Sequence, residues 1–74
     1  MRHEFTYVIE PPEEDDPWYI AFCPEVPEAN GQGKTEQEAI ESLKSAIELV
    51  LDYRREQGLK GIPDTAKRGV VELG

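Results

Sequence analysis

Carboxylates are the most numerous groups in this 74-residue chain that could do chemistry, since Asp and Glu together number sixteen. A two-metal nuclease site needs several carboxylates on neighbouring strands, which hold the two ions about 4 Å apart around the scissile phosphate. Glu4 and Glu10 lie on one face of the first predicted strand, but the second predicted strand, 18–23, contains no carboxylate. We therefore expect no catalytic residue, no metal-binding residue, no cofactor and no enzymatic activity.

Four consecutive carboxylates form the densest charge cluster of the sequence. They are Glu13, Glu14, Asp15 and Asp16. Adjacent residues lack the spaced pattern of an oxygen-ligand cation site, so a solvated acidic loop is the better interpretation. A second interpretation stays open, in which this loop attracts a basic protein partner by long-range steering.

Histidine and cysteine occur once each, as His3 and Cys23. His3 has no Cys, Ser or Asp companion at a spacing that would make it a general base. Cys23 has no positively charged neighbour in the sequence that would favour its thiolate. We interpret His3 as a surface strand residue and Cys23 as a small apolar filler.

The composition predicts a soluble cytoplasmic domain that binds neither membranes nor nucleic acids directly. The formal net charge of -8 repels phosphate backbones and favours a basic partner, although solubility alone explains an acidic surface equally well. A single cysteine cannot form an internal disulfide and suits a reducing compartment. The sequence has neither a signal-peptide pattern nor the run of ~20 apolar residues that spans a membrane.

The first 23 residues predict a β-hairpin. Polar and apolar residues alternate over 3–10, with Phe5, Tyr7 and Ile9 on the side expected to be buried. The segment 11–17 combines prolines with like charges and is typical of an exposed hairpin loop. An apolar run at 18–23 then forms the second strand.

Prolines and glycines mark the next turn and a third strand. Pro24 and Pro27 end the second strand, because each restricts the residue before it. A short strand is predicted at 29–32. Gly31 and Gly33 weaken it, and we expect them to supply either positive φ angles or a close approach to a helix.

A long amphipathic helix is predicted from Thr35 to Gln57. Thr35 and Glu38 form a capping box, in which the Glu38 carboxylate is expected to accept from the Thr35 amide, and Gly58 is a natural stop. Apolar residues recur at helical spacing: Ala39, Ile40, Leu43, Ala46, Ile47, Val50 and Leu51. This stripe is expected to pack on the sheet.

The rest of the chain predicts a return connection at 59–68 and a short final strand at 70–73. The expected fold is α+β, a β-β-β-α-β two-layer sandwich within a single domain, 1–74. Its sheet has three or four mainly antiparallel strands, and the long helix packs on one face.

The turn, the connector and the opening of the helix resemble the HicB family of small antitoxins. The matching residues are Pro24, Pro27, Gly33, Thr35, Glu38 and Ala39. The resemblance extends over about 7–53. Departures fall in the turn, where Glu25 and Val26 replace the usual Asp and Leu, and where Glu28 and Ala29 replace Gly and Cys.

Membership of that family would imply a truncated ribonuclease H fold. In the family, this domain covers a small basic toxin of HicA type that cleaves messenger RNA, and a separate C-terminal segment binds operator DNA. The present sequence stops before such a segment, so we do not expect direct DNA binding.

Two functions follow as hypotheses. The leading one is a HicB-like antitoxin that neutralises a toxin by protein contact, and the alternative is a stand-alone homo-oligomeric binding module without toxin partner or DNA-binding activity. Trp18 and Tyr19 are candidate partner-binding residues, because a sheet covered on one side leaves its other face open to association. One of the two is expected to pack in the core. Leu49 lies off the main helical stripe and is a third candidate. The four carboxylates of the acidic loop are further candidates.

Overall fold

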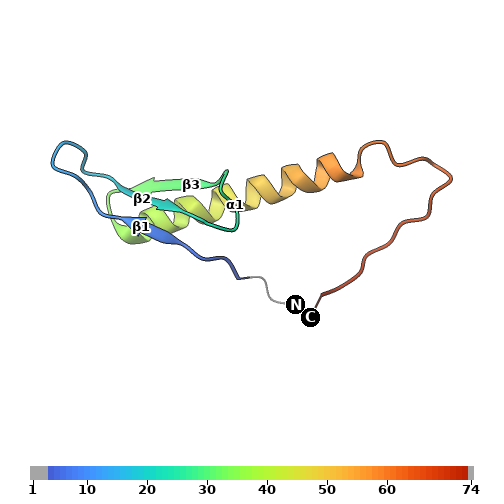
Figure 1. The fold of residues 1–74 in the computed structure, drawn as a ribbon, viewed down its shortest axis with the longest axis horizontal. Helices are drawn as coiled ribbons and strands as arrows, with labels where there is room; N and C mark the ends of the chain where they lie inside the picture. The colour runs from blue at the N-terminus through green and yellow to red at the C-terminus, as the bar shows by residue number, and fades with distance from the viewer. Residues whose placement is uncertain (1–3, 74) are drawn as a thin grey trace.

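The computed structural model describes residues 4–73, and its elements follow the order β1, β2, β3, α1 (Figure 1). Their bounds are Val8–Glu10 for β1, Tyr19–Phe22 for β2, Asn30–Gly33 for β3 and Glu36–Leu59 for α1. The strands form an antiparallel sheet in the order β1-β2-β3, and α1 lies on one side of it (Figure 1). The expected α+β arrangement of three antiparallel strands and a long helix is confirmed.

The strand register determines which side chains face the helix. Ile9 lies opposite Ala21, and Ala21 lies opposite Gly31. Ala21 is fully buried against the helix and Ile9 packs against the same core. Because side chains alternate along a strand, the residues between these positions point to the opposite face.

Two consecutive turns connect β2 to β3. The Val26 N–H donates to the Cys23 carbonyl at 3.1 Å, and the Ala29 N–H donates to the Val26 carbonyl at 2.9 Å. Each turn has a proline, Pro24 or Pro27, at its second position, where the fixed φ of proline suits the turn. Both turns thereby direct an apolar side chain inward, since Val26 and Ala29 are buried.

Gly31 and Gly33 allow β3 to contact the helix backbone directly. A Cβ atom on Gly31 would lie 2.3 Å from the Leu43 nitrogen, and one on Gly33 would lie 2.4 Å from the Glu38 Cβ. Neither glycine has a positive φ. Of the two predicted reasons for these glycines, close approach of strand and helix is therefore the correct one.

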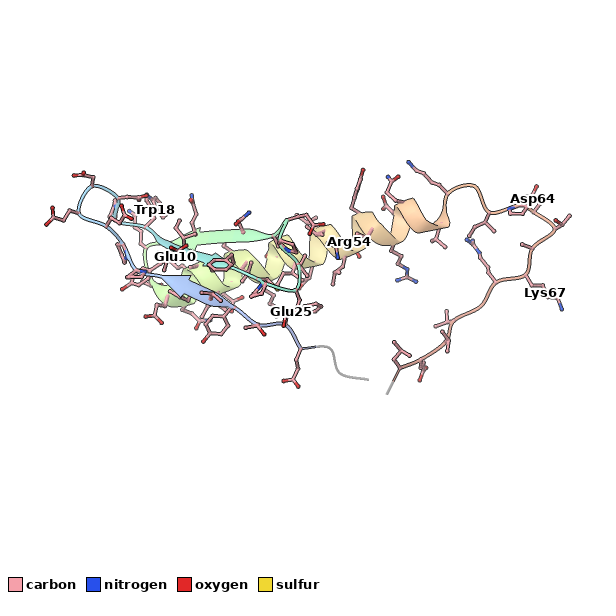
Figure 2. The ribbon with its side chains drawn as sticks, viewed as in Figure 1. Glu10, Trp18, Glu25, Arg54, Asp64 and Lys67 are labelled. Atoms are coloured by element: carbon pink, nitrogen blue, oxygen red, sulfur yellow. The ribbon has the colours of Figure 1, made fainter. Side chains whose placement is uncertain are left out.

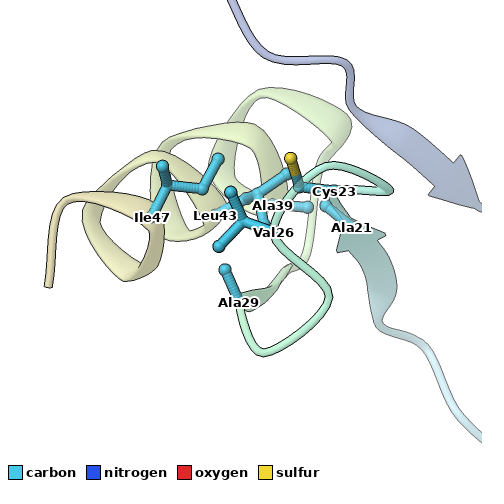
Figure 3. Close-up of a cluster of buried hydrophobic side chains, with 7 residues drawn as sticks. All are labelled: Ala21, Cys23, Val26, Ala29, Ala39, Leu43 and Ile47. Atoms are coloured by element: carbon cyan, nitrogen blue, oxygen red, sulfur yellow. The ribbon is translucent and has the colours of Figure 1, made fainter. Parts of the chain in front are cut away.

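The core is small and lies between the sheet, the double turn and the first half of α1 (Figure 3). Its buried members are Ala21, Cys23, Val26, Ala29, Ala39, Leu43 and Ile47. Cys23 is thus an apolar filler, as predicted. His3 lies outside the described residues.

The helix begins as predicted but differs in two details. The Glu38 N–H donates to Thr35 Oγ1 at 3.1 Å, which confirms the N-cap. The Glu38 carboxylate accepts from the Lys34 amide at 2.8 Å, and not from Thr35 as expected. The predicted stop at Gly58 is wrong, because the helix continues to Leu59 and the positive φ of 78° occurs at Gly61.

The predicted first strand is too long, and the predicted last strand is absent from the structure. β1 starts at Val8, and Phe5 and Tyr7 remain 38% and 54% exposed although they lie on the expected side. The predicted strand at 70–73 does not form, and Val70 and Val71 are 88% and 83% exposed. A strand needs a neighbour to pair with, and the connection at 60–69 carries this segment away from the sheet (Figure 1).

Candidate protein-binding surface

The face of the sheet opposite the helix, which we call the open face, is a surface without a covering layer. The register assigns to it residues from all three strands: Val8, Glu10, Ile20, Phe22, Asn30 and Gln32. Of the described residues, 4–73, none forms a second layer over this face (Figure 1). The open face is therefore available to another molecule.

An apolar stripe crosses the open face along β2. Ile20 and Phe22 are only half-buried, as is Val8, the cross-strand partner of Phe22. The flanking positions are polar, with Glu10 on one side and Gln32 on the other, both paired with Ile20. An apolar centre with a polar border is the usual composition of a protein-binding patch.

Trp18 extends this stripe at the hairpin end of β2. Its side chain is 37% exposed, and the Lys34 Nζ atom lies 5.9 Å from the centroid of the indole ring. The Trp18 N–H donates to Asp16 Oδ1 at 3.2 Å. An exposed tryptophan beside a cation is a suitable anchor for protein association.

The predicted acidic loop is a tight hairpin that projects beyond the sheet (Figure 2). Glu13 and Asp16 exchange backbone hydrogen bonds of 3.0 and 3.1 Å, so Glu14 and Asp15 occupy its tip. All four carboxylates are exposed, and Asp16 contacts Trp18. Within residues 4–73, no three Asp, Glu, His or Cys side chains gather closely enough to hold a metal ion.

The other two predicted contact residues, Tyr19 and Leu49, do not lie on the open face. Tyr19 points to the helix side and packs against the core, so it is the aromatic residue of the pair that stabilises the fold. Leu49 is 70% exposed and lines a shallow hollow with Glu28 and Tyr53. That hollow adjoins the β2–β3 connection, at the end of the sheet away from the acidic hairpin.

An ion pair fixes the β2–β3 connection to the helix. Arg54 Nε donates to Glu28 Oε2 at 3.2 Å, and the Arg54 Nη2 atom also contacts this carboxylate. This hydrogen bonding lowers the pKa of Glu28 below its usual value of 4.5. Both side chains are about half exposed, so the pair orients the helix more than it stabilises the fold.

A groove that sequence reasoning did not predict lies between the segment that leads into β1 and the helix, and we call it the β1-edge groove. It holds about 400 Å³. Its walls are the segment before β1 and one flank of the helix: Phe5, Thr6, Tyr7, Ile40, Leu43, Lys44, Ile47, Glu48 and Leu51. The sequence feature that could have indicated this groove is the width of the helical apolar stripe. The stripe is wider than three short strands can cover.

The chain exposes far more surface than its size requires. Its accessible area is 6336 Å², whereas a compact monomer of the same mass exposes about 4,600 Å². Its radius of gyration is 16.6 Å, against about 11 Å for a compact domain of this length. Much of the excess comes from residues 51–73, all of which are exposed.

Comparison with known proteins identifies a relative that matches almost the whole chain. The chain is 48% identical over 66 residues to the UPF0150 protein ssl0738 of Synechocystis sp., and the match covers 89% of each chain. No family model matches the chain, and no solved structure matches it significantly.

No helix within residues 4–73 combines the length and the apolar character needed to cross a membrane.

Proposed function

The chain belongs to the UPF0150 family, and we propose that it is a protein-binding module that neutralises a small, basic, mRNA-cleaving toxin by direct contact. The observation that supports this most is the open face of the sheet. There Trp18, Ile20 and Phe22 form an apolar stripe with no layer over it among the described residues. Small domains seldom leave such a face to water unless a partner uses it.

The charge distribution supports a basic partner. The acidic hairpin of residues 13–16 adjoins the Trp18 end of the stripe. Three of the eight basic side chains, Lys60, Lys67 and Arg68, lie beyond the helix, so the folded body is more acidic than the whole chain. Such a field accelerates association with a basic protein and repels nucleic acid.

The resemblance of the turn and helix opening to HicB antitoxins supports the choice of a toxin as partner. The residues of that motif shape the core side of the molecule, where Pro24 and Pro27 form the double turn and Gly33 contacts the helix. They leave the opposite face of the sheet available for binding. We further propose that the protein acts in the cytoplasm, where messenger RNA is the toxin's target.

Co-expression with a short basic protein encoded beside this chain tests the proposal. We expect the two proteins to purify as a stable complex, and the chain to restore growth to cells that express the basic protein. Phe22→Asp, which places a charge on the open face, should abolish both effects. Leu49→Asp is the matched control, because Leu49 is exposed on the helix and does not belong to the open face. Failure of the wild-type pair to bind would reject the toxin as partner.

The excess surface favours a second candidate function, a self-associating binding module without a toxin. The chain exposes about 1,700 Å² more than a compact monomer, which is enough to supply one side of a stable interface. Analytical ultracentrifugation of the isolated chain tests this candidate. A chain that stays monomeric at all concentrations would reject it.

A further inference from the structure

We propose that the β1-edge groove of one copy receives the segment 70–73 of a second copy as a fourth strand, and that two copies exchange these segments reciprocally. This inference does not rest on the toxin proposal, because the groove lies at the sheet edge and on the helix side, not on the open face. Four features support it: the groove, the segment, the surface that the pairing covers and the charge.

The groove has the shape and chemistry of an empty strand position. β1 pairs only with β2 among the described strands, so its outer edge is free to bind another extended segment. Below that edge, the helix presents Ile40, Ile47 and Leu51, and the segment before β1 contributes Phe5 and Tyr7. A strand added at this edge would bury these apolar side chains against one of its faces.

The segment 70–73 has the pattern of such a strand. In extended conformation, Val71 and Leu73 point to one side and Val70 and Glu72 to the other. Its three apolar side chains are 68% to 88% exposed in the structure. Val71 and Leu73 can therefore face the groove while Glu72 stays in water, as expected of a half-buried edge strand.

Exposed apolar side chains on the far half of the helix favour a second copy as the source of the strand. The connection of residues 60–69 can span about 33 Å when extended, so its length alone does not restrict the segment to its own chain. A strand from the same chain would leave the exposed Tyr53 and Leu59 of the helix, which lie outside the groove, without a partner. Reciprocal exchange brings a second body beside the far half of the helix, and a dimer of this kind needs only about 800 Å² from each copy.

Charge also favours the exchange. Lys67 and Arg68 lie just before the segment 70–73, whereas the groove, with Lys44 and Glu48 on its wall, belongs to an acidic body. Two such bodies repel each other when they approach without their basic connections. An exchanged connection places positive charge between them.

A pair of neighbouring substitutions tests the role of the segment. We expect wild-type protein to sediment as a dimer, and Val71→Asp to weaken dimerisation by about tenfold or more, because each dimer buries this side chain twice. Val70→Asp is the matched control, since it makes the same change on the face that points away from the groove. A monomeric wild-type protein, or equal effects of the two substitutions, would overturn the proposal.

A mixing experiment separates exchange between copies from docking within one chain. Tyr7→Asp damages the groove but leaves the segment intact, and Tyr7 is exposed enough for the subunit to fold, which circular dichroism verifies. Val71→Asp damages the segment and leaves the groove intact. We expect each variant alone to be mainly monomeric and an equimolar mixture to form heterodimers, because one intact segment then meets one intact groove. A mixture no heavier than its components would show that the segment docks within its own chain.

Discussion

The Glu25 carboxylate accepts two hydrogen bonds from Thr6, one from the backbone N–H at 2.9 Å and one from Oγ1 at 2.7 Å. Continuing the β1–β2 register would place Thr6 opposite Pro24, which lacks an N–H and ends the ladder. Glu25 replaces the missing backbone partner and ties the segment before β1 to the double turn. The Cys23 thiol also donates to this carboxylate, at 3.3 Å.

These contacts predict an acid-sensitive element of stability. The hydrogen bonds from the Thr6 side chain and backbone lower the pKa of Glu25 from 4.5 to about 2. A group with a depressed folded-state pKa stabilises the fold fully above its unfolded pKa, and the stabilisation is lost as the pH falls through the folded value. We expect Glu25→Gln to lower the melting temperature at pH 7, and the difference from wild type to shrink as the pH falls from 4.5 to about 2.

The control for this experiment is Glu14→Gln, which removes the same charge at the exposed tip of the hairpin. Its melting temperature should follow that of wild type at every pH. Thr6→Val provides a second check, because it removes the Oγ1 donor and should make the pH dependence shallower. A Glu25→Gln difference that stays constant down to a pH of about 2 would contradict the assignment.

Gly31→Ala should destabilise the fold by about 3 kcal/mol, because overpacking against immovable atoms is costly. The added Cβ atom would lie 2.3 Å from the Leu43 nitrogen and 2.5 Å from the Ala39 carbonyl oxygen, and helix backbone cannot rotate away. Urea denaturation measures the free energy of unfolding. Gly58→Ala is the control, since nothing lies within 4 Å of its added Cβ atom and alanine favours a helix interior by about 1 kcal/mol.

Local signals predicted β1, β2, β3, a proline-bounded turn and the helix, because each depends on residues close in sequence. Thr35 caps the helix through the amide three residues on, and Pro24 and Pro27 set turns four residues long. Alternation showed that Trp18 and Tyr19 point to opposite faces. It did not show which face meets the helix, since that depends on Gly31 and Gly33, which lie on another strand.

Long-range relationships explain what the sequence did not predict. A strand at 70–73 requires an edge to pair with, and no pattern within VVEL specifies which edge or which copy supplies it. The β1-edge groove arises because α1 is offset toward β3 and β2. This offset depends on Gly31 and Gly33, which let β3 contact the helix backbone. The Thr6–Glu25 contact joins residues 19 positions apart, which no local pattern of residues specifies.

Thr35→Ala should cost about 1 kcal/mol of stability, because the hydroxyl satisfies one of the free amides at the helix N-terminus. The acceptor is Thr35 Oγ1, 3.1 Å from the Glu38 nitrogen. Thermal melts of the variant and of Thr65→Ala, a threonine in the exposed connection, give the comparison. Equal melting temperatures would show that this cap contributes nothing.

The acidic hairpin should affect the rate of partner binding more than the lifetime of the complex. Changing all four carboxylates of residues 13–16 to amides should slow association with the proposed basic partner by about tenfold at low salt, and the difference should fade as salt screens the charges. Stopped-flow mixing measures the rates. The control changes Glu41, Glu48, Asp52 and Glu56 on the helix to amides, which alters the net charge equally. Equal slowing of both variants would mean that net charge, and not the hairpin, steers association.

Trp18→Ala should weaken binding of the basic partner by about 2 kcal/mol, since a half-exposed tryptophan beside an apolar stripe is a typical hot spot. The indole is 37% exposed, and Lys34 holds its ring through a cation–π contact. Titration calorimetry measures the change. Leu49→Ala removes a more exposed apolar side chain on the helix, at the end of the sheet away from the acidic hairpin, so it should leave the affinity unchanged if the partner binds the open face. The reverse ranking would move the binding site to the helix.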